Sequence, residues 1–243
     1  MTINFQDAYK ALEAAKAEAE KAAKLGVATG DAGVINFANE NLSKATAAFC
    51  EVLERDTVQI EGKVNLLRAE YSLLQKLASD NKVSLEKIIN GITVENGRIV
   101  EADWESSGLK DISAVAGLTA LTWLNLNDNQ ITDISALKGL ATLTELYLVE
   151  NQITDISALS GLTALTELEL QSNNITDISA LQGRTALTRL LLSNNQITDI
   201  SALKGLTALT VLHLKKNPLI KNKTLQELIE LFRSRDCDVR VDL

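Results

Sequence analysis

The sequence is poor in the residues that mark several classes of protein. Its 243 residues include one proline, one histidine and two cysteines, and only 4% are aromatic. Cys50 and Cys237 lie far apart, so a disulfide framework is not expected. Together with His213 they supply too few ligands for a zinc site. We therefore expect neither a metal nor a cofactor.

The sequence also lacks a net positive charge and long apolar runs. The net charge is −8, which argues against a nucleic-acid partner, because binding along phosphates requires clustered Lys and Arg. No uninterrupted apolar run approaches the roughly 20 residues of a membrane span. The first six residues lack the basic start and apolar stretch of a secretory signal. This favours the cytoplasm over secretion, although removal of a leader would leave the same start.

A repeat of 22 residues dominates the second half of the chain. Successive units begin at the leucines Leu121, Leu143, Leu165, Leu187 and Leu209. A degenerate unit precedes them from Ile99, and Asn217-Pro218 interrupts the last. Each unit opens with alternating leucines, which predicts a short strand with every second side chain inward. Stacked units of this kind predict a solenoid with degenerate ends.

Two polar columns recur in the repeat. One asparagine per unit follows the strand, and we expect it to bridge the backbones of adjacent coils (Asn129, Asn151, Asn173, Asn195 and Asn217). An aspartate two residues before a serine also recurs (Asp133, Asp155, Asp177 and Asp199). We interpret these aspartates as turn and helix caps, because a calcium ladder needs several converging oxygen ligands per site. Arg184 interrupts a leucine column, so we expect it to bend outward or to pair nearby.

The repeat consensus N-Q-I-T-D-I-S-A-L-x-G-L-T-x-L-T-x-L-x-L resembles the 22-residue repeats of internalins and related bacterial leucine-rich-repeat proteins. The resemblance covers residues 99–219. It implies an α/β solenoid with one concave parallel β-sheet, and recognition of a protein by that concave face. The region before the repeats is unlike the small cap of internalins, and no export or wall-anchoring signal is visible. A role at a host cell surface is therefore not implied.

The two ends of the chain predict caps. Apolar residues at three- to four-residue spacing predict three helices over residues 5–78, the third carrying Ile60, Val64, Leu67 and Tyr71. We expect a three-helix bundle that caps the solenoid, or a second interaction module, a homodimer contact being a further candidate. Residues 92–101 predict a hairpin with an Asn96-Gly97 turn. A helix over 224–235 and a final strand predict the C-terminal cap. The expected segments are 1–90, 91–219 and 220–243.

The function is predicted to lie in the strand positions that differ between repeats. Diverse outward side chains on a uniform scaffold suggest a recognition surface. The predicted partner-binding residues are Trp123, Asn125, Asn127, Glu145, Tyr147, Val149, Glu167, Glu169, Gln171, Arg189, Leu191, His213 and Lys215. Trp123 and Tyr147 should lie close together as anchors, and charge changes from acidic to basic along the coils, which would orient a partner.

We therefore predict a non-catalytic protein-binding module. His213 has no cysteine or serine at a spacing that predicts a dyad, and an open sheet offers no desolvated pocket for a catalytic carboxylate. A carbohydrate stacked on Trp123 and Tyr147 is the alternative ligand. An engineered consensus-type scaffold is a further possibility, since the repeats are unusually alike.

Overall fold

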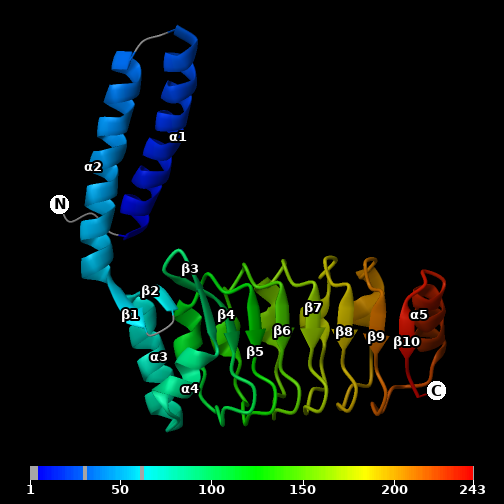
Figure 1. The fold of residues 1–243 in the computed structure, drawn as a ribbon. Coiled ribbons are helices and arrows are strands. Elements are labelled where there is room, and N and C mark those ends of the chain that lie inside the picture. The colour runs from blue at the N-terminus through cyan, green and yellow to red at the C-terminus, as the bar shows by residue number, and fades with distance from the viewer. Residues whose placement is uncertain (1–4, 30–31, 61–62, 243) are drawn as a thin grey trace. The chain divides into compact units, whose positions relative to one another are not determined.

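A computed structural model describes residues 5–29, 32–60 and 63–242 (Figure 1). The chain forms two compact units, Met1–Ala69 and Glu70–Leu243. None of the described helices combines the length and apolar character needed to cross a bilayer.

The first unit is a pair of helices followed by a β-hairpin. Helices α1 (Phe5–Thr29) and α2 (Ala32–Asp56) pack against each other. Ala8, Leu12 and Ala38 are buried. Strands β1 (Thr57–Ile60) and β2 (Lys63–Leu67) pair antiparallel. The first two predicted helices are confirmed.

The prediction of a third helix beginning at Ile60 was wrong. Helix α3 begins only at Arg68 and ends at Asn81, and Ile60, Val64 and Leu67 lie in the β1–β2 hairpin. Thr57–Ile60 contains the strand-forming residues Thr57, Val58 and Ile60, and their preference for extended structure overrides the helical spacing. The predicted three-helix bundle is thus a two-helix hairpin, with nearly all of α3 in the second unit.

The second unit begins with two helices and a hairpin. Helix α4 (Leu85–Asn90) is capped by Ser84, whose side chain accepts the Lys87 amide. Strands β3 (Ile92–Glu95) and β4 (Arg98–Asp103) pair antiparallel, and Asn96 and Gly97 have the positive φ values of a tight turn. The predicted hairpin is confirmed. The buried carboxylate of Glu70 in α3 anchors it, accepting from the Ile99 amide at 2.6 Å and from Arg98 Nε.

The repeats form a regular stack. After β4, five three-residue strands continue the sheet in parallel: β5 (Trp123–Asn125), β6 (Glu145–Tyr147), β7 (Glu167–Glu169), β8 (Arg189–Leu191) and β9 (Val211–His213). Short 3₁₀ helices return the chain on the other side: η1 (Ser113–Gly117), η2 (Ser135–Leu137), η3 (Ser157–Gly161), η4 (Ser179–Leu181) and η5 (Ser201–Gly205). Leucines and isoleucines between the two sides are almost wholly buried. The predicted leucine-rich solenoid is confirmed.

The asparagine column links consecutive coils, as predicted. The Oδ1 atom of Asn151 accepts from the Ile131 amide of the preceding coil at 3.0 Å. Its Nδ2 donates to the carbonyl of Leu126 at 3.0 Å and to that of Leu148. The same pattern recurs at Asn129, Asn173, Asn195 and Asn217. Each side chain therefore satisfies buried backbone groups that the turn leaves without partners.

The aspartate column forms Asx turns at the start of the 3₁₀ helices. In each of the four repeats, aspartate Oδ1 accepts the amide of the serine two residues later, at 2.7–2.9 Å (Asp133, Asp155, Asp177 and Asp199). Three of the serine hydroxyls also donate to the second carboxylate oxygen. Within the described residues no cluster of acidic, histidine or cysteine side chains could hold a metal ion. The expected turn role of the aspartates is confirmed, whereas the N-cap positions themselves are isoleucines.

Arg184 is half-buried in a column of leucines. The corresponding side chains of Leu118, Leu140, Leu162 and Leu206 are fully buried. The Nε and Nη1 atoms of Arg184 are buried without a hydrogen-bond partner. The expectation that it pairs nearby is therefore not met for these two donors, and their desolvation should cost stability.

The C-terminal cap is confirmed. Helix α5 (Lys223–Arg233) is capped by Asn222, and its buried face is apolar (Leu225, Leu228, Ile229 and Phe232). Strand β10 (Asp238–Arg240) adds to β9 in parallel as the last strand of the sheet. Cys237, just before it, is buried and free.

We predict that Asn151→Ala lowers the free energy of unfolding by about 2–3 kcal/mol, because the buried Ile131 amide loses its acceptor. Denaturant unfolding followed by circular dichroism measures the change. The control is Gln152→Ala next to it, which removes an exposed side chain and should cost less than about 0.5 kcal/mol. Equal losses in the two variants would contradict a structural role for the column.

We predict that Arg184→Leu stabilises the protein by about 1–3 kcal/mol, since it restores the leucine column and removes two buried donors without partners. The reverse change in the neighbouring coil, Leu162→Arg, should be strongly destabilising. Thermal unfolding of both variants checks the pair. A loss of stability in Arg184→Leu would show that the arginine is favourably placed.

Candidate partner-binding face

One side of the sheet points away from the leucine core, and we call it the sheet face. Its side chains form three columns along the solenoid. The first is Glu101, Trp123, Glu145, Glu167, Arg189, Val211 and Asp238. The second is Asp103, Asn125, Tyr147, Glu169, Leu191, His213 and Arg240. The third, just past the strands, is Glu105, Asn127, Val149, Gln171, Ser193 and Lys215.

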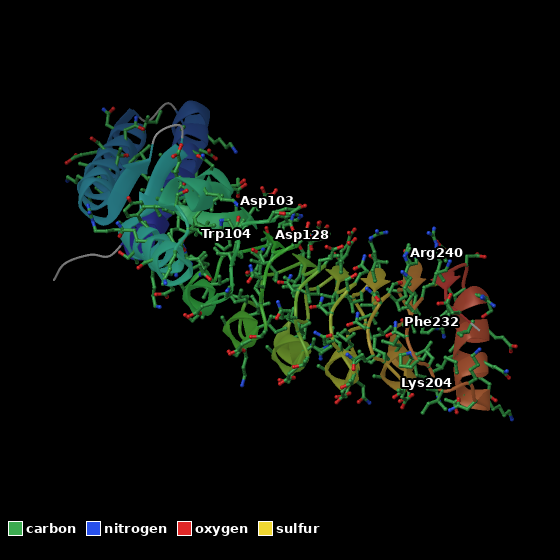
Figure 2. All side chains as sticks on the ribbon, turned by 90° about the horizontal axis from the view of Figure 1, so that it is seen from below. Asp103, Trp104, Asp128, Lys204, Phe232 and Arg240 are labelled. Carbon is green, nitrogen blue, oxygen red and sulfur yellow. The ribbon has the colours of Figure 1, made fainter. Side chains whose placement is uncertain are left out.

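Figure 2 shows the face in profile. Asp103 and Arg240 project from its two ends on the same side of the solenoid, whereas Lys204 of η5 projects from the opposite side. Side chains from strands far apart in the sequence therefore share one surface.

Trp123 and Tyr147 form a ring pair on this face. Their centroids lie 5.5 Å apart with the planes tilted by 48°, and both side chains are half-buried. The predicted proximity of the two aromatics is confirmed. Such tilted contacts are favourable between aromatic rings.

Two carboxylates hold the tyrosine in place. Its hydroxyl donates to Glu145 Oε2 at 2.7 Å and lies 3.3 Å from Glu167 Oε2. Burial, and then the Glu145 carboxylate, raise the pKa of Tyr147 above its ordinary value. The phenol therefore stays a hydrogen-bond donor throughout the physiological range, which fixes the ring against Trp123.

Two predicted binding residues are covered by their neighbours. Leu191 is only 3% exposed and Asn125 only 7%. Asn125 Nδ2 donates to Glu105 Oε2 at 3.0 Å, and its Oδ1 accepts the Asn127 amide. Asn127 Oδ1 in turn accepts the Val149 amide at 2.7 Å. The prediction that Asn125 and Leu191 are available to a partner is therefore wrong: Asn125 is engaged by Glu105 and the Asn127 amide, and Leu191 is packed among its neighbours.

Among the other predicted residues, the acidic side chains lie on the earlier strands and the basic ones toward the C-terminal end of the face. Arg189 Nε donates to Glu169 Oε1 at 3.1 Å, and Gln171 lies beside Glu169. Toward the C-terminus, Lys215 is exposed and His213 Nε2 lies 3.7 Å from Asp238 Oδ2. Arg240 also bonds Asp238, and this contact lowers the pKa of the Asp238 carboxyl.

Sequence reasoning missed Asp238 and Arg240 as part of the face. It predicted a final edge strand but not that the strand is parallel to β9 and in register with the repeats. The alternation of Asp238, Val239 and Arg240 was the available signal. The 22-residue spacing could not reveal it, because the C-terminal helix interrupts the period.

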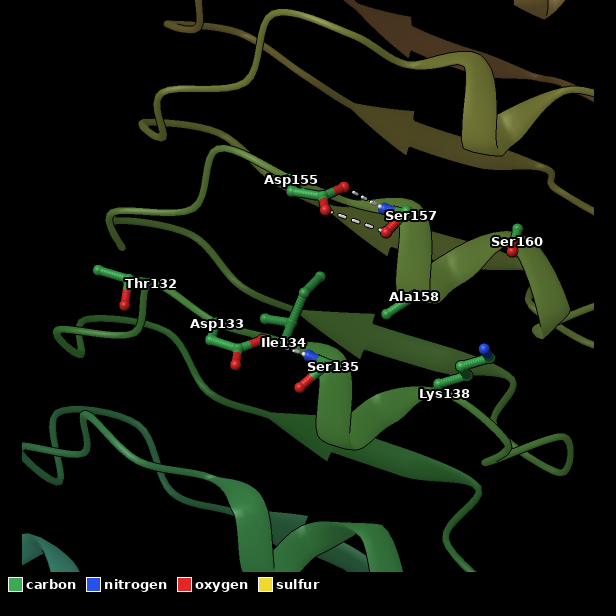
Figure 3. Close-up of a pocket in the computed structure, with 9 residues that line it drawn as sticks. All are labelled: Thr132, Asp133, Ile134, Ser135, Lys138, Asp155, Ser157, Ala158 and Ser160. Carbon is green, nitrogen blue, oxygen red and sulfur yellow. Dashed lines mark hydrogen bonds between the residues drawn. The ribbon is translucent and has the colours of Figure 1, made fainter.

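A hollow of about 610 Å³ lies on the opposite side of the solenoid, between η2 and η3 (Figure 3). Asp133 and Asp155 line it, and both carboxylates already accept from serine amides. A similar hollow of about 440 Å³ recurs one coil later, around Asp155 and Asp177. Such repetition is expected from stacked turns, so the hollows reflect the repeat and not a ligand site.

Comparison with known proteins supports the repeat assignment. Family models of leucine-rich repeats match residues 119–158, 141–183 and 163–219. No curated protein sequence matches the chain significantly. Proteins of this repeat family generally mediate protein–protein interactions.

Solved structures of bacterial leucine-rich-repeat proteins resemble the chain. An internalin (InlF) from Listeria monocytogenes is 32% identical with a TM-score of 0.55, over 61% of this chain and 44% of that one. Internalin C2 from the same species is 38% identical with a TM-score of 0.54, over 59% and 62%. A leucine-rich-repeat protein from Leptospira interrogans is 28% identical with a TM-score of 0.51, over 59% and 37%. In each case the chain matches less than two thirds of the relative's length.

We predict that Glu167→Gln raises the free energy of unfolding by a few tenths of a kcal/mol, because Glu145 and Glu167 stand directly opposite each other on adjacent strands. The gain should shrink at high salt, which screens the repulsion. Glu227→Gln on α5 is the control, since Glu227 pairs with Lys223 and its loss should not stabilise. A destabilised Glu167→Gln variant would contradict net repulsion at this pair.

Proposed function

Because the chain is a leucine-rich-repeat protein with internalin-like repeats, we propose that it is a non-catalytic module that binds a protein partner on the sheet face. The observation that carries the proposal is the Trp123–Tyr147 pair, two half-buried aromatic rings in contact on a rigid sheet. Aromatic side chains held in this way are frequent anchors of protein interfaces, since they bury a large area at little entropic cost.

The pattern of variation along the repeats supports the proposal. Core positions such as Leu124, Leu146 and Leu168 are leucine in every strand from β5 to β9 and wholly buried. The positions between them carry tryptophan, tyrosine, glutamate and arginine in turn. A scaffold needs uniform packing, whereas recognition needs a distinct set of groups at the surface.

Catalysis has less support. The Nε2 atom of the single histidine, His213, lies 3.7 Å from the Asp238 carboxylate of the edge strand β10. The glutamates of the face lie on an open sheet, which offers no enclosed pocket for a catalytic carboxylate. Bound carbohydrate is the alternative ligand, with sugar rings on Trp123 and Tyr147. The 48° tilt between the two rings favours a protein, because it does not offer one flat stacking platform.

Several further expectations remain predictions. These are the division into segments 1–90, 91–219 and 220–243, a homodimer through the N-terminal helices, a cytoplasmic location, and the absence of a nucleic-acid partner.

The test is an affinity capture with the intact chain, followed by repetition with the double variant Trp123→Ala/Tyr147→Ala. We expect a specific protein to be lost while the melting temperature changes by only a few degrees, since neither ring is in the core. The controls are Phe37→Ala and Ile220→Ala, which remove exposed apolar side chains outside the face. Retained capture by the double variant would exclude the proposed site. Release of the captured partner by simple sugars would favour the carbohydrate alternative.

A further inference from the structure

We propose that the partner segment docked on the early half of the sheet face is basic, an extended stretch of protein that places an arginine against Trp123. This inference rests on the proposed function and specifies the chemistry of the partner. The early half comprises the face residues of β4 to β7 and the turns that follow them, from Glu101 to Gln171.

Charge on the early half is of one sign. It carries six carboxylates and no basic side chain (Glu101, Asp103, Glu105, Glu145, Glu167 and Glu169). The only ion pair recorded for these carboxylates among the described residues joins Glu169 to Arg189, at the border with the later half. The remaining five carboxylates therefore present an uncompensated negative surface, which attracts a cationic partner and repels phosphates.

Trp123 is flanked by two of these carboxylates. Glu101 and Glu145 are its direct register partners on the two adjacent strands, so a carboxylate stands on each side of the indole at about 4.8 Å strand spacing. A cation over an indole ring gains from the ring's electron density. A guanidinium is also planar and donates in two directions at once, so it suits flanking carboxylates better than an ammonium group does.

The aromatic wall beside this position is fixed before any partner arrives. Tyr147 contacts the indole ring and is tied by its hydroxyl to Glu145 and Glu167. The partner therefore does not have to immobilise the rings, which favours affinity. Glu145 and Glu167 are register neighbours on the parallel strands β6 and β7, so a cation close to both would reduce the repulsion between their charges.

The experiment uses the intact chain and four probes of defined charge. Binding of fluorescently labelled octa-arginine, octa-lysine and octa-glutamate peptides is followed by anisotropy at low and at physiological salt, with unlabelled spermine as competitor. We expect octa-arginine to bind more tightly than octa-lysine, octa-glutamate not to bind, and affinity to fall with salt. Spermine, which cannot form planar contacts, should compete only weakly.

Charge-neutral variants locate the site. The double variant Glu101→Gln/Glu145→Gln keeps the side-chain shapes, and we expect octa-arginine affinity to fall about tenfold or more. Trp123→Ala should lower it by roughly 2- to 30-fold. The matched control is Glu227→Gln/Glu230→Gln on α5, which removes the same charge away from the face and should leave affinity unchanged. Circular dichroism confirms that each variant is folded.

Three results would overturn the inference: no preference for octa-arginine over octa-glutamate, equal losses in the face and α5 variants, or equal binding of spermine and octa-arginine. The proposed function is judged separately, by whether capture of a protein partner depends on Trp123 and Tyr147. If that dependence held while octa-arginine failed to bind, the face would bind a protein of other chemistry. If octa-arginine bound but capture did not depend on the aromatics, the protein-binding site would lie elsewhere.

Discussion

The side-chain hydrogen bonds that tie each coil to the one before it are the constraint on which the repeat region depends. A single coil cannot bury its own leucines, and its tight turn leaves amides and carbonyls without backbone partners. Stacking a second coil in register buries the leucines, and an asparagine at the turn then hydrogen-bonds the backbone groups of the coil before it. Asn151 bonds the Ile131 amide and the Leu126 carbonyl in this way. Register between coils then determines which side chain stands beside which on the sheet face. The contact between Trp123 and Tyr147 follows from that register.

Regularity explains why the repeats could be predicted and the ends only partly. In the repeats, five copies of one pattern specify strand, turn and cap together, so the roles of the asparagine and aspartate columns followed from the sequence. At Ile60, Val64 and Leu67 a helical spacing and a pair of short strands fit the same residues, and strand propensity decided the outcome. A single occurrence of an ambiguous pattern carries less information than a repeated one.

The sequence predicted which side chains point to the outer face, but not how exposed each of them is. Alternation correctly placed Asn125 and Leu191 on the outer face, but it could not show that neighbouring side chains bury them. Their burial depends on the particular residues of adjacent coils, such as Glu105 beside Asn125. Asp238 and Arg240 were missed for a different reason: they join the face through a strand that lies outside the repeat period.

Side-chain direction is the central claim, and hydroxyl-radical labelling read by mass spectrometry tests it most directly, because the chain contains only two tryptophans. Trp104 is fully buried and donates its indole N–H to the Ile88 carbonyl, whereas Trp123 is half-buried on the sheet face. We predict rapid labelling of Trp123 and Tyr147 and protection of Trp104 in the native protein. Labelling of Trp104 at the rate of Trp123 or faster would contradict it.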